Sequence, residues 1–82
     1  MPRYYFHVTD DEERRDEQGT SLADLAAARL ESLRFAGALL SELEGRNIWS
    51  GKDWSMRVSD SDDLTLFTLV FSAHAAPAIL GQ

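Results

Sequence analysis

The chain has 82 residues, no cysteine, 44% hydrophobic residues and a formal net charge of −6. This length holds one hydrophobic core, and the lack of cysteine excludes disulfides, cysteine-ligated metal centres and thiol catalysis. The acid excess argues against nucleic acid or an anionic membrane as the partner, because both are bound through basic residues.

The chain begins with a predicted strand over residues 4–9, which is rich in aromatic and β-branched residues. Successive side chains of a strand point to opposite faces, and both faces of this segment are fairly apolar. We therefore expect either a central strand or a strand whose second face is covered by a partner.

The most charged segment is residues 10–17, where six acidic residues and two arginines give −4 of the chain's −6. It is typical of a solvated hairpin tip, followed by a short second strand near residues 15–20 with Gly19 at a turn. An EF-hand calcium loop is not expected, because its fifth position counted from Asp10 is Arg14. The candidates for electrostatic contact with a basic partner are Asp10, Asp11, Glu12 and Glu13.

Leucine and alanine recur at helical spacing over residues 22–44, which predicts one long amphipathic helix. Ser21 and Asp24 fit a capping box at its start, and Gly45 fits a left-handed residue at its end. Such a helix would be ~34 Å long, whereas a six-residue strand spans only ~20 Å. This mismatch points to a partner surface, most simply a second copy of the chain.

Two further strands are predicted after the helix. Residues 54–59 alternate between apolar and polar, and residues 64–72 form a last strand that is apolar on both faces. Trp49, in the loop before them, either anchors an interface or covers the end of the helix layer. Residues 73–82, with Pro77 and several alanines, are expected to form a loosely ordered tail.

These elements predict an α+β fold in the order β-β-α-β-β: a small antiparallel sheet with one long helix packed on one face. Residues 1–72 are expected to form this single domain. The predicted core consists of Phe6, Val8, Leu25, Leu33, Leu40, Trp54, Val58, Leu69 and Phe71. The candidate interface residues, on whichever sheet face the helix leaves open, are Tyr5, His7, Phe67 and Val70, with Trp49 in addition.

The sequence carries no phosphate-binding, dinucleotide-binding or nucleophile-elbow motif. His7 and His74 have no metal-ligating or catalytic partners at a recognisable spacing. We therefore expect a protein without enzymatic activity, cofactor or metal. No signal peptide or membrane-spanning stretch is evident, which favours the cytoplasm.

Several motifs resemble a known family of short bacterial proteins, the domain of unknown function numbered six thousand eight hundred and ninety-four. They are Pro2-Arg3-Tyr4-Tyr5-Phe6-His7-Val8, Asp16-Glu17-Gln18-Gly19-Thr20-Ser21-Leu22, Ala28-Arg29, Trp54-Ser55-Met56-Arg57-Val58-Ser59-Asp60 and Leu69-Val70-Phe71-Ser72. The chain departs from the family at Asp62-Asp63, where glycine is frequent, and at Val70, where proline is frequent. The resemblance implies no activity and no catalytic residues.

Two functional hypotheses follow. The first is a homodimeric module that binds protein and has no enzymatic activity. The second is an antitoxin-like regulator that neutralises a small basic toxin or nuclease, because the predicted topology resembles the HicB antitoxins, in which a sheet with a crossing helix binds a basic toxin.

Overall fold

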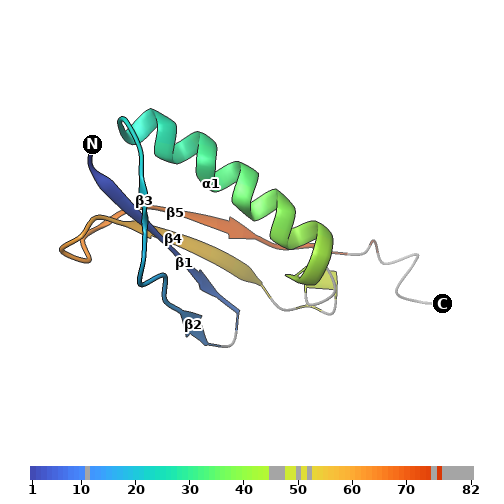
Figure 1. The fold of residues 1–82 in the computed structure, drawn as a ribbon. Coiled ribbons are helices and arrows are strands. Elements are labelled where there is room, and N and C mark those ends of the chain that lie inside the picture. Colours follow the sequence, from blue (N-terminus) through green and yellow to red (C-terminus); the bar gives the residue numbers. More distant parts are fainter. Residues whose placement is uncertain (11, 45–47, 50, 52, 75, 77–82) are drawn as a thin grey trace.

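The computed structural model describes residues 1–10, 12–44, 48, 49, 51, 53–74 and 76 (Figure 1). Its elements are β1 (Arg3–Thr9), β2 (Glu13–Arg14), β3 (Thr20–Ser21), α1 (Leu25–Leu39), the π-helical segment η1 (Leu40–Glu44), β4 (Trp54–Ser59) and β5 (Thr65–Phe71). The α+β class is as predicted. Asp11, Gly45 and most of the expected tail lie outside the described residues.

The five strands form one antiparallel sheet in the order β2-β1-β4-β5, and β3 also pairs with β1. Phe6 of β1 lies opposite Val58 of β4, and Met56 of β4 lies opposite Leu69 of β5. The helix α1 crosses one face of this sheet (Figure 1). We call the other face the open face.

The predicted order of elements is close to the observed one, but the bounds of the second strand, expected near residues 15–20, are wrong. Two strands of two residues flank this segment instead: β2 pairs with the end of β1, and β3 pairs with its start. The chain between them leaves the strand path, because the side chain of Asp16 bonds to β1 where a backbone ladder would otherwise run.

The core lies between the sheet and α1. The sheet contributes large buried side chains, namely Tyr4, Phe6, Val8, Trp54, Met56 and Val58. The helix contributes Ala28, Ser32 and Ala36, which are spaced by four residues and lie on one stripe. Because Trp54 and Met56 fill the space between the layers, only small helix residues fit against them.

The predicted core is confirmed at Phe6, Val8, Trp54 and Val58, which are all buried. It is wrong at Leu25 and Leu33, which are 36% and 56% exposed. The remaining members are partly buried against the core: Leu40, Leu69 and Phe71. Leu33 lies ~100° around the helix from Ser32 and so points away from the sheet, whereas Leu25 shares the face of Ser32 but is the first residue of the helix.

The helix begins later than predicted. Asp24 is its N-cap, with a carboxylate oxygen that accepts from the backbone N–H of Ala27 at 2.9 Å. Ser21 instead belongs to β3, and the N–H of Leu22 still donates to the carbonyl of Pro2 at 3.0 Å. The α-helical part, α1, is ~22 Å long and matches the ~23 Å of a seven-residue strand. The part of the helix that was expected to extend beyond the sheet is therefore confined to η1.

Among the described residues, no helix has the length and apolar character that crossing a membrane requires.

Candidate functional site

The outer edge of β1 is closed by one carboxylate. Between β2 and β3, Oδ2 of Asp16 accepts from the backbone N–H of Phe6 at 3.2 Å. Its other oxygen, Oδ1, accepts from the N–H groups of Gln18 at 3.1 Å and Gly19 at 3.0 Å. A side chain thus takes the place that a neighbouring strand would occupy, and the edge N–H of β1 is satisfied.

These bonds also set the charge of Asp16. Burial alone raises the pKa of a carboxyl group, but the N–H groups of Gly19, Phe6 and Gln18 outweigh it and hold the pKa of Asp16 below its ordinary value. Asp16 is therefore ionised wherever the protein is folded near neutral pH.

Gly19 is required by the same turn. It has a φ of +72°, in the left-handed region, and a Cβ there would lie 2.8 Å from Cγ of Arg3 and 2.8 Å from Cε2 of Tyr5. Arg3 in turn donates to the carbonyl of Gln18 at 2.8 Å. The turn from Asp16 to Gly19 is thus held against β1 by contacts with Arg3 and Tyr5.

His7 projects toward the open face but is only 1% exposed. Its Nδ1 accepts from the backbone N–H of Asp16 at 3.1 Å, so the proton of the neutral ring is on Nε2, 2.8 Å from Oγ of Ser59. The ring of Tyr5 lies parallel to the imidazole at a centroid distance of 6.4 Å. Burial, and then the charges of Arg57 and Arg15, lower the pKa of His7.

The His7–Ser59 pair is arranged in the opposite sense to a serine nucleophile and its base. In such a pair the imidazole accepts the proton of the hydroxyl, whereas here Nε2 donates to Ser59. Ser59 is itself 1% exposed. The pair is thus a buried hydrogen bond that joins β1 to β4.

A network of four charges covers His7 on the open face. Arg57 binds Glu13 through Nε and Nη2, both at 3.2 Å, and donates from Nη1 to Asp63 at 3.1 Å. Arg15 donates to the same Asp63 oxygen at 3.0 Å. The hydrogen bond from Arg57 lowers the pKa of Glu13. Hydrogen bonds from Arg15, and then from Arg57, lower the pKa of Asp63.

Asp63 is one of the positions at which the sequence departs from the family that it resembles. Its φ is 63°, a left-handed conformation that glycine adopts freely. Aspartate tolerates this conformation better than most residues, and here its carboxylate joins Arg15 to Arg57. The departure from the family pattern therefore leaves the turn intact.

The acidic segment is bound largely by arginines of this chain. Asp10 pairs with Arg14 at 3.2 Å, and Glu13 pairs with Arg15 and Arg57, each at 3.2 Å. Glu12 is exposed. Within the described part of the chain, no three histidine or carboxylate side chains gather in a group that would hold a metal ion.

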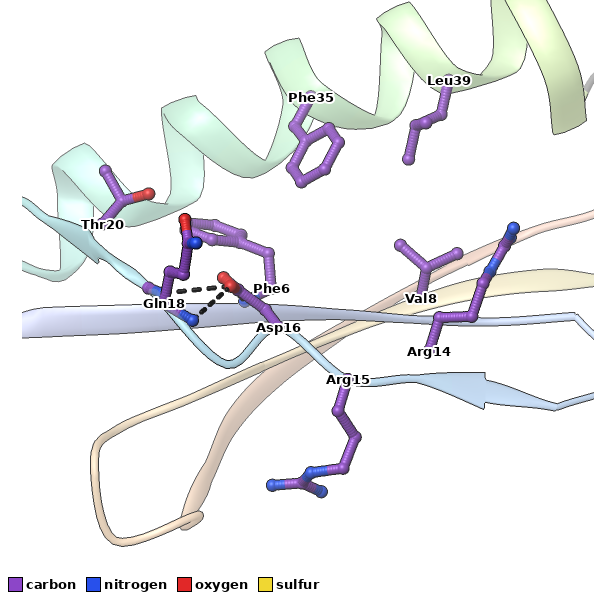
Figure 2. Close-up of a pocket in the computed structure, with 10 residues that line it drawn as sticks. Phe6, Val8, Arg14, Arg15, Asp16, Gln18, Thr20, Phe35 and Leu39 are labelled. Carbon is purple, nitrogen blue, oxygen red and sulfur yellow. Dashed lines mark hydrogen bonds between the residues drawn. The ribbon is translucent and has the colours of Figure 1, made fainter.

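A pocket of about 470 Å³ opens between α1 and the segment that follows β2 (Figure 2). Phe35 and Leu39 point down from the helix toward Phe6 and Val8 of β1, and the Phe35 ring meets Phe6 edge-on at 6.2 Å. Arg15 points away from it, to the far side of the sheet. One wall of the pocket is therefore apolar.

The opposite side of the molecule ends in β5, a seven-residue edge strand of sequence Thr-Leu-Phe-Thr-Leu-Val-Phe without a charged residue or proline. No described strand pairs with its outer side. Val70 is 68% exposed on the open face, and Leu64 and Leu66 beside it are exposed as well.

One flank of α1 continues this apolar surface. Leu33 precedes Phe35 by two residues, so it lies ~160° around the helix axis from it. Since Phe35 faces β1, Leu33 lies on the other flank of the helix, toward the β5 side, and is 56% exposed. We call β5 together with Leu33 the β5 wall.

The predicted interface residues separate in the structure. Tyr5, His7 and Val70 point to the open face, but His7 is covered by the charge network. Phe67 lies opposite Val58 on the helix face and packs against the core. Trp49 is 71% exposed.

The sequence did not reveal Asp16, Arg57 and Asp63 as members of a shared arrangement. The only signal for Asp16 was its three-residue spacing from Gly19. Arg57 meets Glu13 across 44 positions of sequence, a contact that no local pattern records.

The comparisons with known proteins give one match. The model of the family described as Domain of unknown function (DUF6894) matches residues 3–72. The chain belongs to this family. No curated protein and no solved structure matches it, so the topological likeness to HicB antitoxins finds no support. In this DUF6894 chain, the Asp-Glu-x-Gly motif of the resemblance is the turn that closes the edge of β1.

Proposed function

We propose that this DUF6894 chain is a protein-binding module without enzymatic activity that works as a homodimer. The observation that carries the proposal is the β5 wall. An edge strand exposes a row of backbone N–H and C=O groups, and proteins usually protect such edges with lysine, proline or a bulge on the strand. The outer side of β5 has no lysine and no proline, its register against β4 shifts only near its start, between the Val58–Phe67 and Ser59–Thr65 pairs, and it is flanked by exposed leucine and valine.

The arrangement of His7 supports the absence of enzymatic activity. The imidazole is buried, its Nδ1 is occupied by the N–H of Asp16, and its proton is directed at Ser59. Both ring nitrogens are thus used in joining β1 to its neighbours. This favours a structural role for the histidine.

The alternative, an antitoxin-like regulator that binds a basic protein, receives less support from the geometry. It relied on an available acidic segment, and Asp10 and Glu13 are engaged with arginines of the same chain. A basic partner would have to displace those arginines before it could bind these two carboxylates.

Light scattering after size-exclusion chromatography tests the proposal. We expect the mass to rise from 9.2 kDa toward twice that value as the concentration increases from low micromolar to millimolar. A mass that stays at 9.2 kDa over the whole range would contradict the homodimer.

A further inference from the structure

We infer that protonation of His7 opens the segment between β2 and β3, residues 15–19, and uncovers the outer edge of β1. We call these residues the gate segment. Hydrogen bonds hold the gate segment against β1, and one of them requires a neutral imidazole. The chain thus carries a local gate that responds to mild acid. This inference does not depend on the proposed homodimer.

The contact that senses the proton is the bond from the backbone N–H of Asp16 to Nδ1 of His7, at 3.1 Å. Nδ1 accepts this bond with the lone pair that also takes up a proton. A protonated ring donates at both nitrogens, so Nδ1 would then direct an N–H at the N–H of Asp16. The bond from Nε2 to Oγ of Ser59 survives, because Nε2 donates in both states. Protonation therefore breaks the contact with the gate segment and keeps the one within the sheet.

Charged groups of both signs face the imidazole on the open face. Arg57 of β4 and Arg15 of the gate segment oppose a positive charge on the ring, whereas Glu13 and Asp63 favour one. The nearest of these is Oδ1 of Asp63, which lies 3.9 Å from Nε2. Burial has the largest effect and holds the pKa of His7 below its ordinary value of 6.5 while the gate segment is closed.

The other groups around the imidazole are the ring of Tyr5 and the carboxylates of Asp16, Glu17 and Asp60. Opening carries Arg15 away together with Asp16 and Glu17, so the charges that leave are of both signs and partly offset each other. The loss of burial decides the balance, because opening lets water reach Nδ1. The open form therefore binds a proton more readily than the closed form.

The gate segment is built to open without the rest of the fold. None of residues 12–20 is buried, whereas β1, β4 and α1 supply the buried core. Opening therefore removes little apolar surface from the interior, which is typical of segments that unfold locally. Gly19, with its φ of +72°, gives the end of the segment the backbone freedom of glycine. Local opening thus costs less free energy than global unfolding.

Opening uncovers two features of β1. The N–H of Phe6 loses the Asp16 carboxylate, so the edge between the β2 and β3 contacts becomes free to pair. The gate segment also forms one wall of the pocket in Figure 2, and Phe35 and Leu39 line the apolar wall that faces it. An unpaired strand edge beside apolar side chains is the surface on which an added strand binds. Protonation thus converts a closed edge into a receptive one.

Proton linkage sets the dependence of the opening on pH. A histidine exposed to water has a pKa near 6.5, and the closed form binds the proton more weakly. Each pH unit below about 6.5 therefore raises the ratio of open to closed forms by up to tenfold, until the closed form is itself protonated. From about pH 7.5 to about pH 5.5 we expect this ratio to rise by up to about tenfold.

Amide hydrogen exchange measures the opening directly. The reporters are the N–H groups of Phe6 and Asp16, and the reference is the N–H of Met56 in β4, which is paired on both sides. After correction for the intrinsic exchange rate, protection of the reporters should fall by up to about tenfold over the same range. Met56 should remain at least tenfold better protected than the reporters at each pH. The nitrogen-15 shifts of the imidazole show whether His7 gains its proton in the same samples.

Two variants assign the response to one nitrogen of the ring. His7→Asn keeps an acceptor near the position of Nδ1 and does not titrate, so protection of the reporters should be equal at both ends of the pH range. Ser59→Ala is the matched control, because it removes the acceptor at Nε2 and leaves the bond at Nδ1. The response to pH should persist in this variant.

Four results would overturn the inference. The first is unchanged protection of the reporters while the imidazole gains its proton, and the second is an imidazole that stays neutral while protection falls. Equal protection of the reporters and Met56 would mean that only global unfolding exposes them. A response that persists in His7→Asn would assign it to another group. If His7→Asn does not fold, the comparison of the reporters with Met56 in the unaltered chain still decides.

Discussion

The backbone N–H of Asp16 donates to Nδ1 of His7 at 3.1 Å, and the Asp16 carboxylate accepts from the N–H of Phe6, the residue before that histidine. One residue therefore both satisfies the edge of β1 and determines which imidazole nitrogen carries the proton. The relationship ties the charge state of a buried side chain to the position of a surface turn.

The neutral state of His7 predicts a stability that depends on pH. The folded pKa is lowered from 6.5, so below about pH 6.5 the unfolded chain takes up a proton that the folded chain does not. The contribution of the neutral imidazole to the free energy of unfolding is complete above about pH 6.5, and it is lost as the pH falls through the folded pKa. Chemical unfolding from slightly alkaline to mildly acidic pH should show this loss before the carboxylates titrate.

The matched variant for this prediction is His7→Asn, which keeps an acceptor near the position of Nδ1 but does not titrate. Its unfolding free energy should be flatter with pH in the same window. Parallel curves for the two proteins would mean that His7 is not the group responsible.

Asp16→Asn should destabilise the fold by about 2 kcal/mol, because an amide offers one acceptor oxygen where the carboxylate accepts three N–H bonds with two. Its control in the same turn is Glu17→Gln, an exposed position where the change should stay within about 0.5 kcal/mol. Urea unfolding measures both. Equal effects would show that the carboxylate bonds contribute little.

The substitutions Gly19→Ala and Gly37→Ala should change the stability of the protein in opposite directions. Gly19→Ala forces a Cβ against Arg3 and Tyr5 at positive φ and should destabilise the protein by about 1–3 kcal/mol. Gly37→Ala adds a methyl to open space within α1 and should stabilise it by about 0.5–1 kcal/mol. Thermal unfolding of the two variants side by side checks the signs, and a loss at both positions would contradict the open space at Gly37.

The alanine stripe of α1 predicts that size matters more than hydrophobicity there. Ala36→Leu overfills the layer against Trp54 and Met56 and should cost at least about 1–3 kcal/mol. Leu33→Ala removes an exposed side chain and should cost under ~1 kcal/mol when measured at concentrations below the Kd of the dimer. If Leu33→Ala proved the more damaging, the helix would be turned the other way.

Local patterns were enough to predict most of the strands. The alternation over residues 54–59 is β4, and the aromatic start of the chain is β1. The start of the helix was missed because Ser21 and Asp24 are both good N-caps. The choice between them is made by the bond from Leu22 to Pro2, which holds residue 22 beside β1.

The orientation of the helix could not be predicted from hydrophobicity. Leucine is more apolar than alanine, so periodicity turned Leu33 toward the sheet. In the structure the helix face that meets the sheet is that of Ala28, Ser32 and Ala36, and Leu33 lies on the flank of the helix. Likewise, Asp16 belonged to an acidic run that suggested solvation. Only the approach of β1 supplies the N–H of Phe6, which joins the N–H groups of Gln18 and Gly19 from the same turn.

The closed edge of β1 also limits how far this chain can polymerise. The segment Thr-Leu-Phe-Thr-Leu-Val-Phe has the uncharged, β-prone composition of strands that stack into fibrils. A fibril that grows sideways through its sheets needs two bonding edges on each copy, and Asp16 leaves this chain with one. Anything that adds to β5 therefore ends the series, because β2, β3 and the Asp16 carboxylate together occupy the other edge.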